Sequence, residues 1–310
     1  MDNFKKEKGY FMGRKYLQTV FILLIIIMKY PLMCYAEENE SFYKQLSKAI
    51  FQLEHYEKIK IEGMDRTNER FVPEGTGFFV RYEDSLYIVS ARHVVDKPFD
   101  LYAKINCRNI NTKEHDIALV KLSKNKWIFH PEEGNENTRP VDVAVMKIYP
   151  VKDRDIIHFS HFSSPSKTVD QFAGKDPEPP KEILVFGFPI NLGFELKEEK
   201  NPMGRKGIAS MVMEKPFIMS KGKYFDKKTV LVDVDAFPGN SGSPAISIST
   251  FGGKIKLEGL LIATNIGGRY AVIEPISRIK EVLEVAKDEE NETARVWVIE
   301  NIGGENNNNE

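Results

Sequence analysis

Short apolar runs separated by turn residues are the feature that most constrains the fold of this chain. From about residue 46 to residue 280 such runs recur, for example at 86–89, 117–120, 183–186 and 260–263. Apolar runs of roughly four to eight residues bounded by Gly, Pro, Asn or Asp are typical of buried β-strands. Many short strands in a region of this size form sandwiches or barrels, so the pattern predicts a mostly β protein.

Helical periodicity is confined to the ends of this region. Segment 276–286 carries one apolar face and predicts a C-terminal helix. Segment 40–56 is ambiguous, with a helical pattern in its first half and a strand pattern from about Lys48. The polar, Pro-rich stretch near 160–180 predicts the link between two halves, and the Asn-rich tail 303–310 is predicted to be disordered.

The first 36 residues differ from the rest of the chain. Basic residues precede an apolar run at 17–28, and the small residues Cys34 and Ala36 precede an acidic stretch. This is the pattern of a signal peptide. The apolar run is shorter than the roughly 20 residues that a membrane span needs, and Lys29 and Pro31 interrupt its extension. We therefore expect residues 1–36 to direct export to the periplasm or the medium, with an uncleaved membrane anchor through residues 17–28 as the alternative.

Composition excludes several classes of function. Lys and Arg number 44 and Asp and Glu number 45, so the charge gives no reason to expect nucleic acid as a partner. Two cysteines provide neither a disulfide scaffold nor a Cys-rich zinc site. No metal or cofactor is expected. Apart from His93, which is discussed below, the histidines do not fall at zinc-ligand spacings. These histidines are His55, His115, His130, His158 and His161.

Three segments carry a candidate active site. The first places His93 directly after an apolar strand, the second opens a strand with Asp142, and the third sets Ser241 in a Gly-rich turn. A serine hydroxyl is a poor nucleophile at neutral pH and needs an adjacent base. The chain supplies a base, a carboxylate that can orient it and a nucleophile, in the order His, Asp, Ser.

With these segments, the chain resembles the trypsin-like serine peptidases of chymotrypsin fold. It is most similar to the bacterial glutamyl-endopeptidase-like group and to the protease domain of the HtrA group. The supporting motifs are Gly-Thr-Gly-Phe at 75–78, Phe-Gly-Phe-Pro at 186–189, Lys-Gly-Ile-Ala-Ser at 206–210 and Gly-Asn-Ser-Gly-Ser-Pro at 239–244. The resemblance covers about residues 46–285 and implies two packed antiparallel six-stranded β-barrels with the active site between them.

The resemblance also implies a role for each residue. His93 would take the proton of Ser241 and pass it to the leaving group, while Asp142 would fix the tautomer of the histidine. The backbone N–H groups of Gly239 and Ser241 would form the oxyanion hole. Asp116 opens a similar apolar strand, but only one predicted strand separates it from His93, so Asp142 is favoured as the acid.

Substrate preference is poorly encoded. By the same resemblance, the substrate pocket would be bordered by the segment before Ser241 and by Thr264, Asn265 and Gly267. Asp235 stands where a trypsin-like enzyme can place an acid that selects Lys or Arg, and the alternative is that it caps a loop. Asn265 replaces a histidine expected for cleavage after glutamate, which argues against that specificity.

The sequence thus predicts an exported serine endopeptidase that cleaves protein or peptide substrates through an acyl-enzyme, without a cofactor. Two alternatives stay open. One is a binding or scaffold module that keeps the fold without turnover, because a fold alone does not establish a function. The other is an esterase-like serine hydrolase. The nucleophilicity of Ser241 separates the first alternative from an enzyme, and turnover of peptides against esters separates the two enzymes.

Overall fold

The computed structural model describes eleven parts of the 310-residue chain. They are residues 49–60, 67–83, 85–108, 115–149, 175–190, 201–215, 225, 228–248, 255–264, 269–288 and 294–295. The chain divides into a unit of residues 1–42 and a unit of residues 43–310, and every described residue belongs to the second. The predicted signal peptide or anchor and the predicted tail therefore lie outside the described residues.

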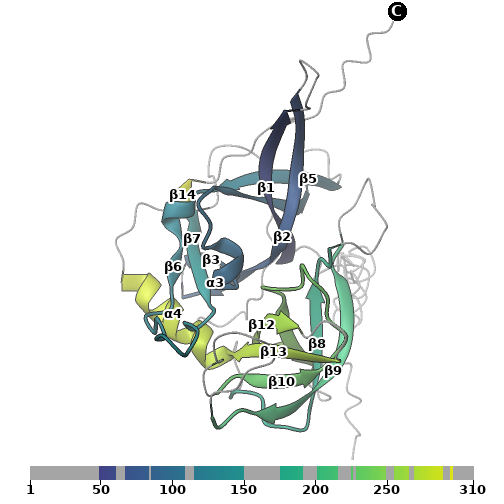
Figure 1. Ribbon diagram of the computed structural model, residues 1–310, viewed down its shortest axis with the longest axis vertical. Helices are drawn as coiled ribbons and strands as arrows, with labels where there is room; N and C mark the ends of the chain where they lie inside the picture. The colour runs from purple at the N-terminus through teal and green to yellow at the C-terminus, as the bar shows by residue number, and fades with distance from the viewer. Residues whose placement is uncertain are drawn as a thin grey trace, which may run out of the picture. The chain divides into compact units, whose positions relative to one another are not determined.

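The N-terminal half of the second unit is an eight-stranded sheet (Figure 1). The strands join in the order β14-β7-β3-β2-β1-β4-β5, with β6 also paired to β7. All of these pairs are antiparallel except β14 with β7. The elements are β1 (Ile50–Lys60), β2 (Thr67–Tyr82), β3 (Ser85–Ser90), α3 (Arg92–Val95), β4 (Leu101–Arg108), β5 (His115–Leu122), η1 (Lys124–Lys126), β6 (Ile128–Phe129), β7 (Ala144–Tyr149) and β14 (Ala294–Arg295).

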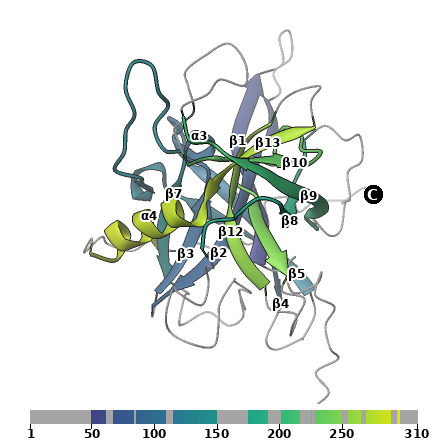
Figure 2. The ribbon, with the colours of Figure 1, turned by 90° about the horizontal axis from the view of Figure 1, so that it is seen from below.

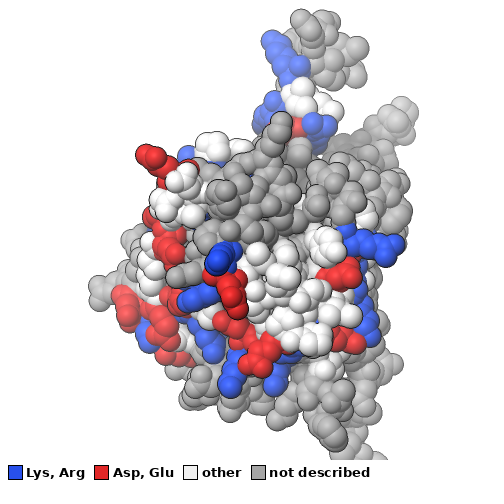
Figure 3. Space-filling model, turned by 60° about the horizontal axis from the view of Figure 1, so that its bottom comes forward, with Lys and Arg blue, Asp and Glu red and all other residues white. Residues whose placement is uncertain are grey.

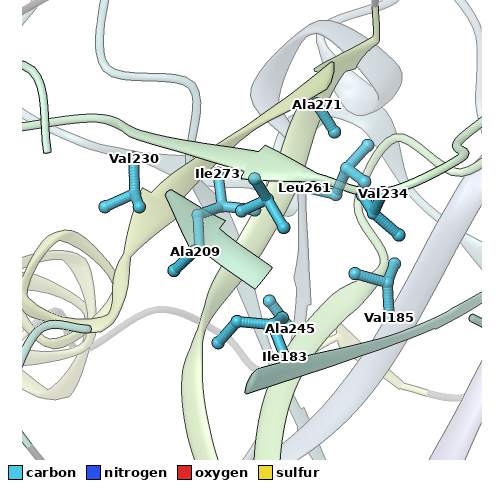
Figure 4. Packing of buried hydrophobic residues seen from close by; sticks show 10 residues of the cluster. Ile183, Val185, Ala209, Val230, Val234, Ala245, Leu261, Ala271 and Ile273 are labelled. Carbon is cyan, nitrogen blue, oxygen red and sulfur yellow. The ribbon is translucent and has the colours of Figure 1, made fainter. Parts of the chain in front are cut away.

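The C-terminal half is a closed six-stranded barrel with the strand order β10-β13-β12-β11-β8-β9. Its strands are β8 (Lys181–Gly187), β9 (Met203–Val212), β10 (Val230–Asp233), β11 (Pro244–Ile248), β12 (Ile255–Thr264) and β13 (Tyr270–Pro275). Alanine, valine, isoleucine and leucine side chains fill its interior, as Figure 4 shows. The buried cluster consists of Ile183, Val185, Ala209, Val230, Val232, Val234, Ala245, Leu261, Ala271 and Ile273.

These two halves form the chymotrypsin-like fold that the sequence predicts, but the N-terminal half is a half-barrel. The described strands of this half make an open sheet, because β5 and β7 do not pair with each other. The outer edge of β7 is instead occupied by β6 beside Ala144 and Val145 and by β14 beside Ile148 and Tyr149. At these residues the edge of β7 is thus paired without closure of a barrel.

The predicted C-terminal helix is confirmed as α4 (Ile276–Asp288). All five residues of its predicted apolar face are buried, namely Ile276, Ile279, Val282, Leu283 and Ala286. The helix lies against β7 of the sheet and β12 of the barrel (Figure 2). The carboxylate of Asp176 accepts the backbone N–H and the hydroxyl of Ser277 at 2.9 and 2.8 Å, which satisfies a free donor in the first turn of the helix.

Two further sequence expectations fall partly inside the described residues. The ambiguous segment 40–56 is a strand from Ile50 onward, and the described part of the predicted link, residues 175–180, leads directly into β8. Among the described helices, none is long and apolar enough to cross a membrane. Acidic and basic side chains are interspersed on the face drawn in Figure 3.

Strand β11 allows a matched test of burial in the C-terminal half. Ile246 is fully buried, whereas Ile248, two residues later, is 42% exposed. We expect Ile246→Ala to lower the free energy of unfolding by about 2–5 kcal/mol, because it leaves a cavity in the core. Ile248→Ala, the same change on the same strand, should stay within about 0.5 kcal/mol of the parent. The midpoints of urea unfolding measure both changes, and equal losses would contradict this description of β11.

Candidate active site

His93 is presented by a short helix at the end of a buried strand. Strand β3 is buried from Leu86 to Ser90, and α3 begins two residues after it ends. Val94 and Val95 are buried and hold the helix against the interior, while the His93 side chain is 49% exposed. The sequence thus anchors the backbone around the histidine and leaves its ring accessible.

Asp142 reaches His93 because β3 and β7 are neighbours in the sheet. Ser90 at the end of β3 pairs with Ala144 at the start of β7, and Asp142 lies two residues before that point. Oδ2 of Asp142 lies 2.6 Å from Nδ1 of His93, and Oδ1 accepts the backbone N–H of His93 at 2.8 Å. A carboxylate only accepts, so Nδ1 carries the ring proton and Nε2 is left as a base.

Asp116, the other candidate acid, lies elsewhere in the sheet. It belongs to β5, where it pairs with Cys107 of β4. Strands β2, β1 and β4 stand between β5 and β3, the strand that leads to His93. The described strand order thus brings the segment of Asp142, and not that of Asp116, to the histidine.

Ser241 lies in the second of two successive tight turns. The N–H of Asn240 donates to the carbonyl of Phe237 at 3.0 Å, and the N–H of Ser243 donates to the carbonyl of Asn240 at 2.9 Å. The third residue of each turn is a glycine with positive φ, 90° at Gly239 and 86° at Gly242. A positive φ at this position is the mark of a type II turn and favours glycine, so the spacing of the two glycines sets the shape of the loop.

The peptide between Pro238 and Gly239 is held in one orientation. Its carbonyl accepts the N–H of Ile190 at 2.7 Å. The peptide is trans, and the N–H and carbonyl of a trans peptide point in opposite directions. The N–H of Gly239, a predicted oxyanion donor, therefore points away from Ile190.

Comparison with known proteins places the chain in a family. A family model described as a trypsin-like peptidase domain matches residues 75–251, more than half of the chain. The chain belongs to the trypsin-like peptidase family. The trypsin-like peptidase domain supports the serine-protease class that the sequence predicts.

Several solved structures are similar to this peptidase at low sequence identity. The HtrA-type protease AlgW, solved with a decapeptide, is 13% identical with a TM-score of 0.46, over 78% of this chain and 65% of its own. The Rv3671c protease from M. tuberculosis, active form, is 14% identical with a TM-score of 0.46, over 84% and 88%. Deg5 is 18% identical with a TM-score of 0.43, over 79% and 92%. Among curated proteins, none matches the chain.

In this peptidase the segment that carries Asp142 is supported from the C-terminal half. The backbone N–H of Asp142 donates to Oε1 of Glu274, a buried residue of β13, at 3.2 Å. The Asp142 carbonyl accepts the N–H of Arg92 at 3.3 Å. The backbone on both sides of the carboxylate is therefore bonded, and Asp142 itself is 13% exposed.

Helix α4 holds the loop that leads to Asp142. Nε2 of the buried His130 donates to Oε2 of Glu281 at 2.6 Å, because its Nδ1 already accepts the N–H of Glu132 at 3.1 Å. Arg278 donates to Glu132 at 2.9 Å and to Glu281 at 3.0 Å. Burial by itself raises the pKa of the Glu281 carboxyl, but the hydrogen bonds from His130 and Arg278 and the charge of Arg278 outweigh it, so this pKa lies below its usual value.

The predicted substrate-binding residues are only partly described. Asp235 is exposed in the segment between β10 and the turns around Ser241, and Thr264 is the half-buried last residue of β12. Asn265 and Gly267 lie outside the described residues. Within the described ranges, no group of three or more His, Cys, Asp or Glu side chains could hold a metal ion.

Sequence reasoning missed the residues that support the site. Glu274, Arg278 and Glu281 lie on β13 and α4, far along the chain from His93 and Asp142. Their only signal is a run of charged residues on a helix, which is more often a solvated face. Thr76 belongs to the Gly-Thr-Gly-Phe motif at 75–78, but that motif does not indicate that its hydroxyl contacts the loop of Ser241.

The ion pair at Glu281 predicts a pH-dependent stability. The pKa of Glu281 is lower in the folded chain than in the unfolded chain, so its stabilisation is full above the unfolded value and is lost as the pH falls through the folded value. Glu281→Gln should cost about 1 kcal/mol near neutral pH, a value reduced because the side chain is 44% exposed.

The measurement for this prediction is a series of urea midpoints for parent and variant from about pH 7 to about pH 3.5. The difference should shrink toward the acid end of the series. Glu284→Gln is the matched control, because it removes only a surface pair with Lys287 on the same helix. A difference for Glu281→Gln that grows as the pH falls contradicts the prediction.

Proposed function

We propose that this peptidase is an endopeptidase that works through a triad of His93, Asp142 and Ser241. The observation that carries the proposal is the double contact of Asp142 with His93, at 2.6 Å to the ring and at 2.8 Å to the backbone N–H. A carboxylate that hydrogen-bonds to both the ring and the backbone N–H of one histidine sets the position and the tautomer of a general base.

The chemistry is acyl transfer in two steps. Nε2 of His93 takes the proton of Ser241 as Oγ attacks the carbonyl carbon of the substrate, and the imidazolium is stabilised by Asp142. His93 then gives the proton to the leaving amine, the C–N bond breaks and an ester on Ser241 remains. Water attacks this ester with His93 again as the base, which releases the carboxylic acid and restores the hydroxyl.

The negative charge that develops on the substrate oxygen would be met by the N–H groups of Gly239 and Ser241. The hydrogen bond from Ile190 to the Pro238 carbonyl supports this role, because it turns the Gly239 N–H away from that side of the loop. Donors held in place before the reaction pay no reorganisation cost when charge appears, and losing one costs about 100- to 1000-fold in rate.

The substrates that we propose are proteins or peptides, bound next to Thr264, Asn265 and Gly267. Asp235 remains a candidate for selecting a basic side chain. We further propose that residues 46–285 form the peptidase domain and that residues 1–36 direct its export to the periplasm or medium or, uncleaved, hold it at the membrane. On the face drawn in Figure 3, the described acidic and basic side chains are interspersed, so this face has no single-sign charge that would favour a strongly acidic or basic substrate.

The first test is covalent labelling with a fluorophosphonate, read by intact mass and peptide mapping. We expect one adduct per chain, on Ser241, because only an activated serine reacts readily with such reagents. Ser241→Ala should remain unlabelled and His93→Ala should be labelled far more slowly. Folded parent protein that takes no label contradicts the proposal and favours a binding module, whereas turnover of esters without peptides favours an esterase.

Asp142→Asn tests the assignment of the acid. The amide would offer an N–H group to Nδ1 and so favour the tautomer with its proton on Nε2, which cannot act as the base. We expect kcat to fall by about 10⁴-fold, the loss known for this change in a serine-protease triad. Asp116→Asn on β5 is the matched control and should leave kcat within about threefold of the parent. The reverse result would assign the acid to Asp116.

A further inference from the structure

Thr76 is a fully buried residue of β2 that contacts three other segments of the chain. Its backbone N–H donates to the carbonyl of Ser241 at 2.9 Å. Its hydroxyl donates to the carbonyl of Gly239 at 2.9 Å and accepts the N–H of Phe188 at 3.0 Å. Its own carbonyl accepts the hydroxyl of Ser90, which is also fully buried, at 2.8 Å.

The direction of the Thr76 hydroxyl proton follows from these contacts. A hydroxyl has one proton to donate and two lone pairs to accept. Because the N–H of Phe188 can only donate, the hydroxyl accepts there, and its single proton is available for the Gly239 carbonyl. A Thr side chain is also stiff at χ1, so the hydroxyl is held in one place.

This hydrogen bond restrains the residue on which the predicted oxyanion hole depends. Gly239 has φ of 90°, and glycine alone has little preference between the two signs of φ. The peptide before Gly239 is held by Ile190 through the Pro238 carbonyl, and the peptide after it is held by Thr76 through the Gly239 carbonyl. With both peptides bonded, the torsions of Gly239 and the direction of its N–H are restrained.

The same residue connects the nucleophile to the base. Ser90 lies three residues before His93 at the end of β3, and its hydroxyl is bonded to Thr76. Thr76 in turn is bonded to Ser241 through its backbone. One buried side chain and its backbone thus span the distance between the strand that carries the base and the loop that carries the nucleophile.

We propose that Thr76 is a positioning residue for the oxyanion hole, acting through its hydroxyl on the Gly239 carbonyl. This inference rests on the proposed function of Ser241, and it adds a group that does not touch the substrate. Without the hydroxyl, Gly239 regains torsional freedom and its N–H spends less time aimed at the developing charge. The chemical step then slows, while the binding of a substrate elsewhere in the site changes little.

Thr76→Val tests the inference, because valine keeps the shape of the side chain and replaces the hydroxyl with a methyl group. The readout is the second-order rate constant for fluorophosphonate labelling of Ser241 in the full chain, with the final extent of labelling measured alongside it. We expect the rate to fall at least about tenfold while labelling still reaches one adduct per chain. Thr76→Ser keeps the hydroxyl, so its second-order rate constant for labelling should lie within about threefold of the parental value.

Thr229→Val is the matched control for a buried threonine, since Thr229 is 1% exposed and precedes β10 away from Ser241. It should label at the parental rate even where it lowers the unfolding midpoint. If Thr76→Val does not fold by circular dichroism, Thr76→Ala against Thr76→Ser makes the same comparison, because these two variants differ by one oxygen.

Three results would overturn the inference alone, while labelling of the parent upholds the proposed function. They are Thr76→Val labelling at the parental rate, Thr76→Ser slowing as much as Thr76→Val, and Thr229→Val slowing as much as Thr76→Val. A parent that is folded but takes no label overturns the proposed function, and the inference with it.

Discussion

The hydrogen bonds between β2 and the loop of Ser241 are the contacts on which the rest of the site depends, because the predicted nucleophile belongs to the barrel and the predicted base and acid belong to the sheet. The approach is close: a Cβ added to Gly242 would lie 2.0 Å from the carbonyl oxygen of Thr76. Each such hydrogen bond has a modest net value of about 1 kcal/mol, but leaving a buried group unpaired costs about 1–3 kcal/mol. The loop therefore cannot shift from β2 without exposing several buried polar groups to that cost.

The acid depends on a second set of contacts that runs in the opposite direction, from the end of the chain back to its middle. Glu274 and Arg278 belong to β13 and α4, and both act on the segment from residue 130 to residue 142. Burial by itself lowers the pKa of Arg278. The hydrogen bond with Glu281 and the charges of Glu132, Glu281 and Glu274 outweigh this effect, so the pKa lies above its usual value. One cation thus offsets the charges of several carboxylates around the segment that leads to Asp142.

The parts of this arrangement that were predictable from the sequence are those that depend on local pattern. Strand β3, α4 and the two turns around Ser241 follow from apolar periodicity and from the positions of Gly239 and Gly242, and the contact of His93 with Asp142 agrees with the favoured assignment. The half-barrel was not predictable, because it depends on which distant strands cover the edge of β7. The roles of Thr76 and Glu281 were not predictable for the same reason: the contacts with Gly239 and with His130 that define these roles join residues more than a hundred positions apart.

Asn240, the residue directly before the predicted nucleophile, is compatible with a loop that is held by hydrogen bonds and not by an ion pair. Its side chain is fully buried, and within the described part of the chain neither atom of its amide has a hydrogen-bond partner. A neutral amide can remain in that position at a cost of about 1–3 kcal/mol, whereas an unpaired carboxylate would cost several times more. An aspartate here would need a cation to pair with, and the loop would then depend on that ion pair. With asparagine, the two turns are held by hydrogen bonds from Ile190 and Thr76, both of which are present in the uncleaved chain. The geometry of Gly239 therefore does not require a charged group to reach residue 240.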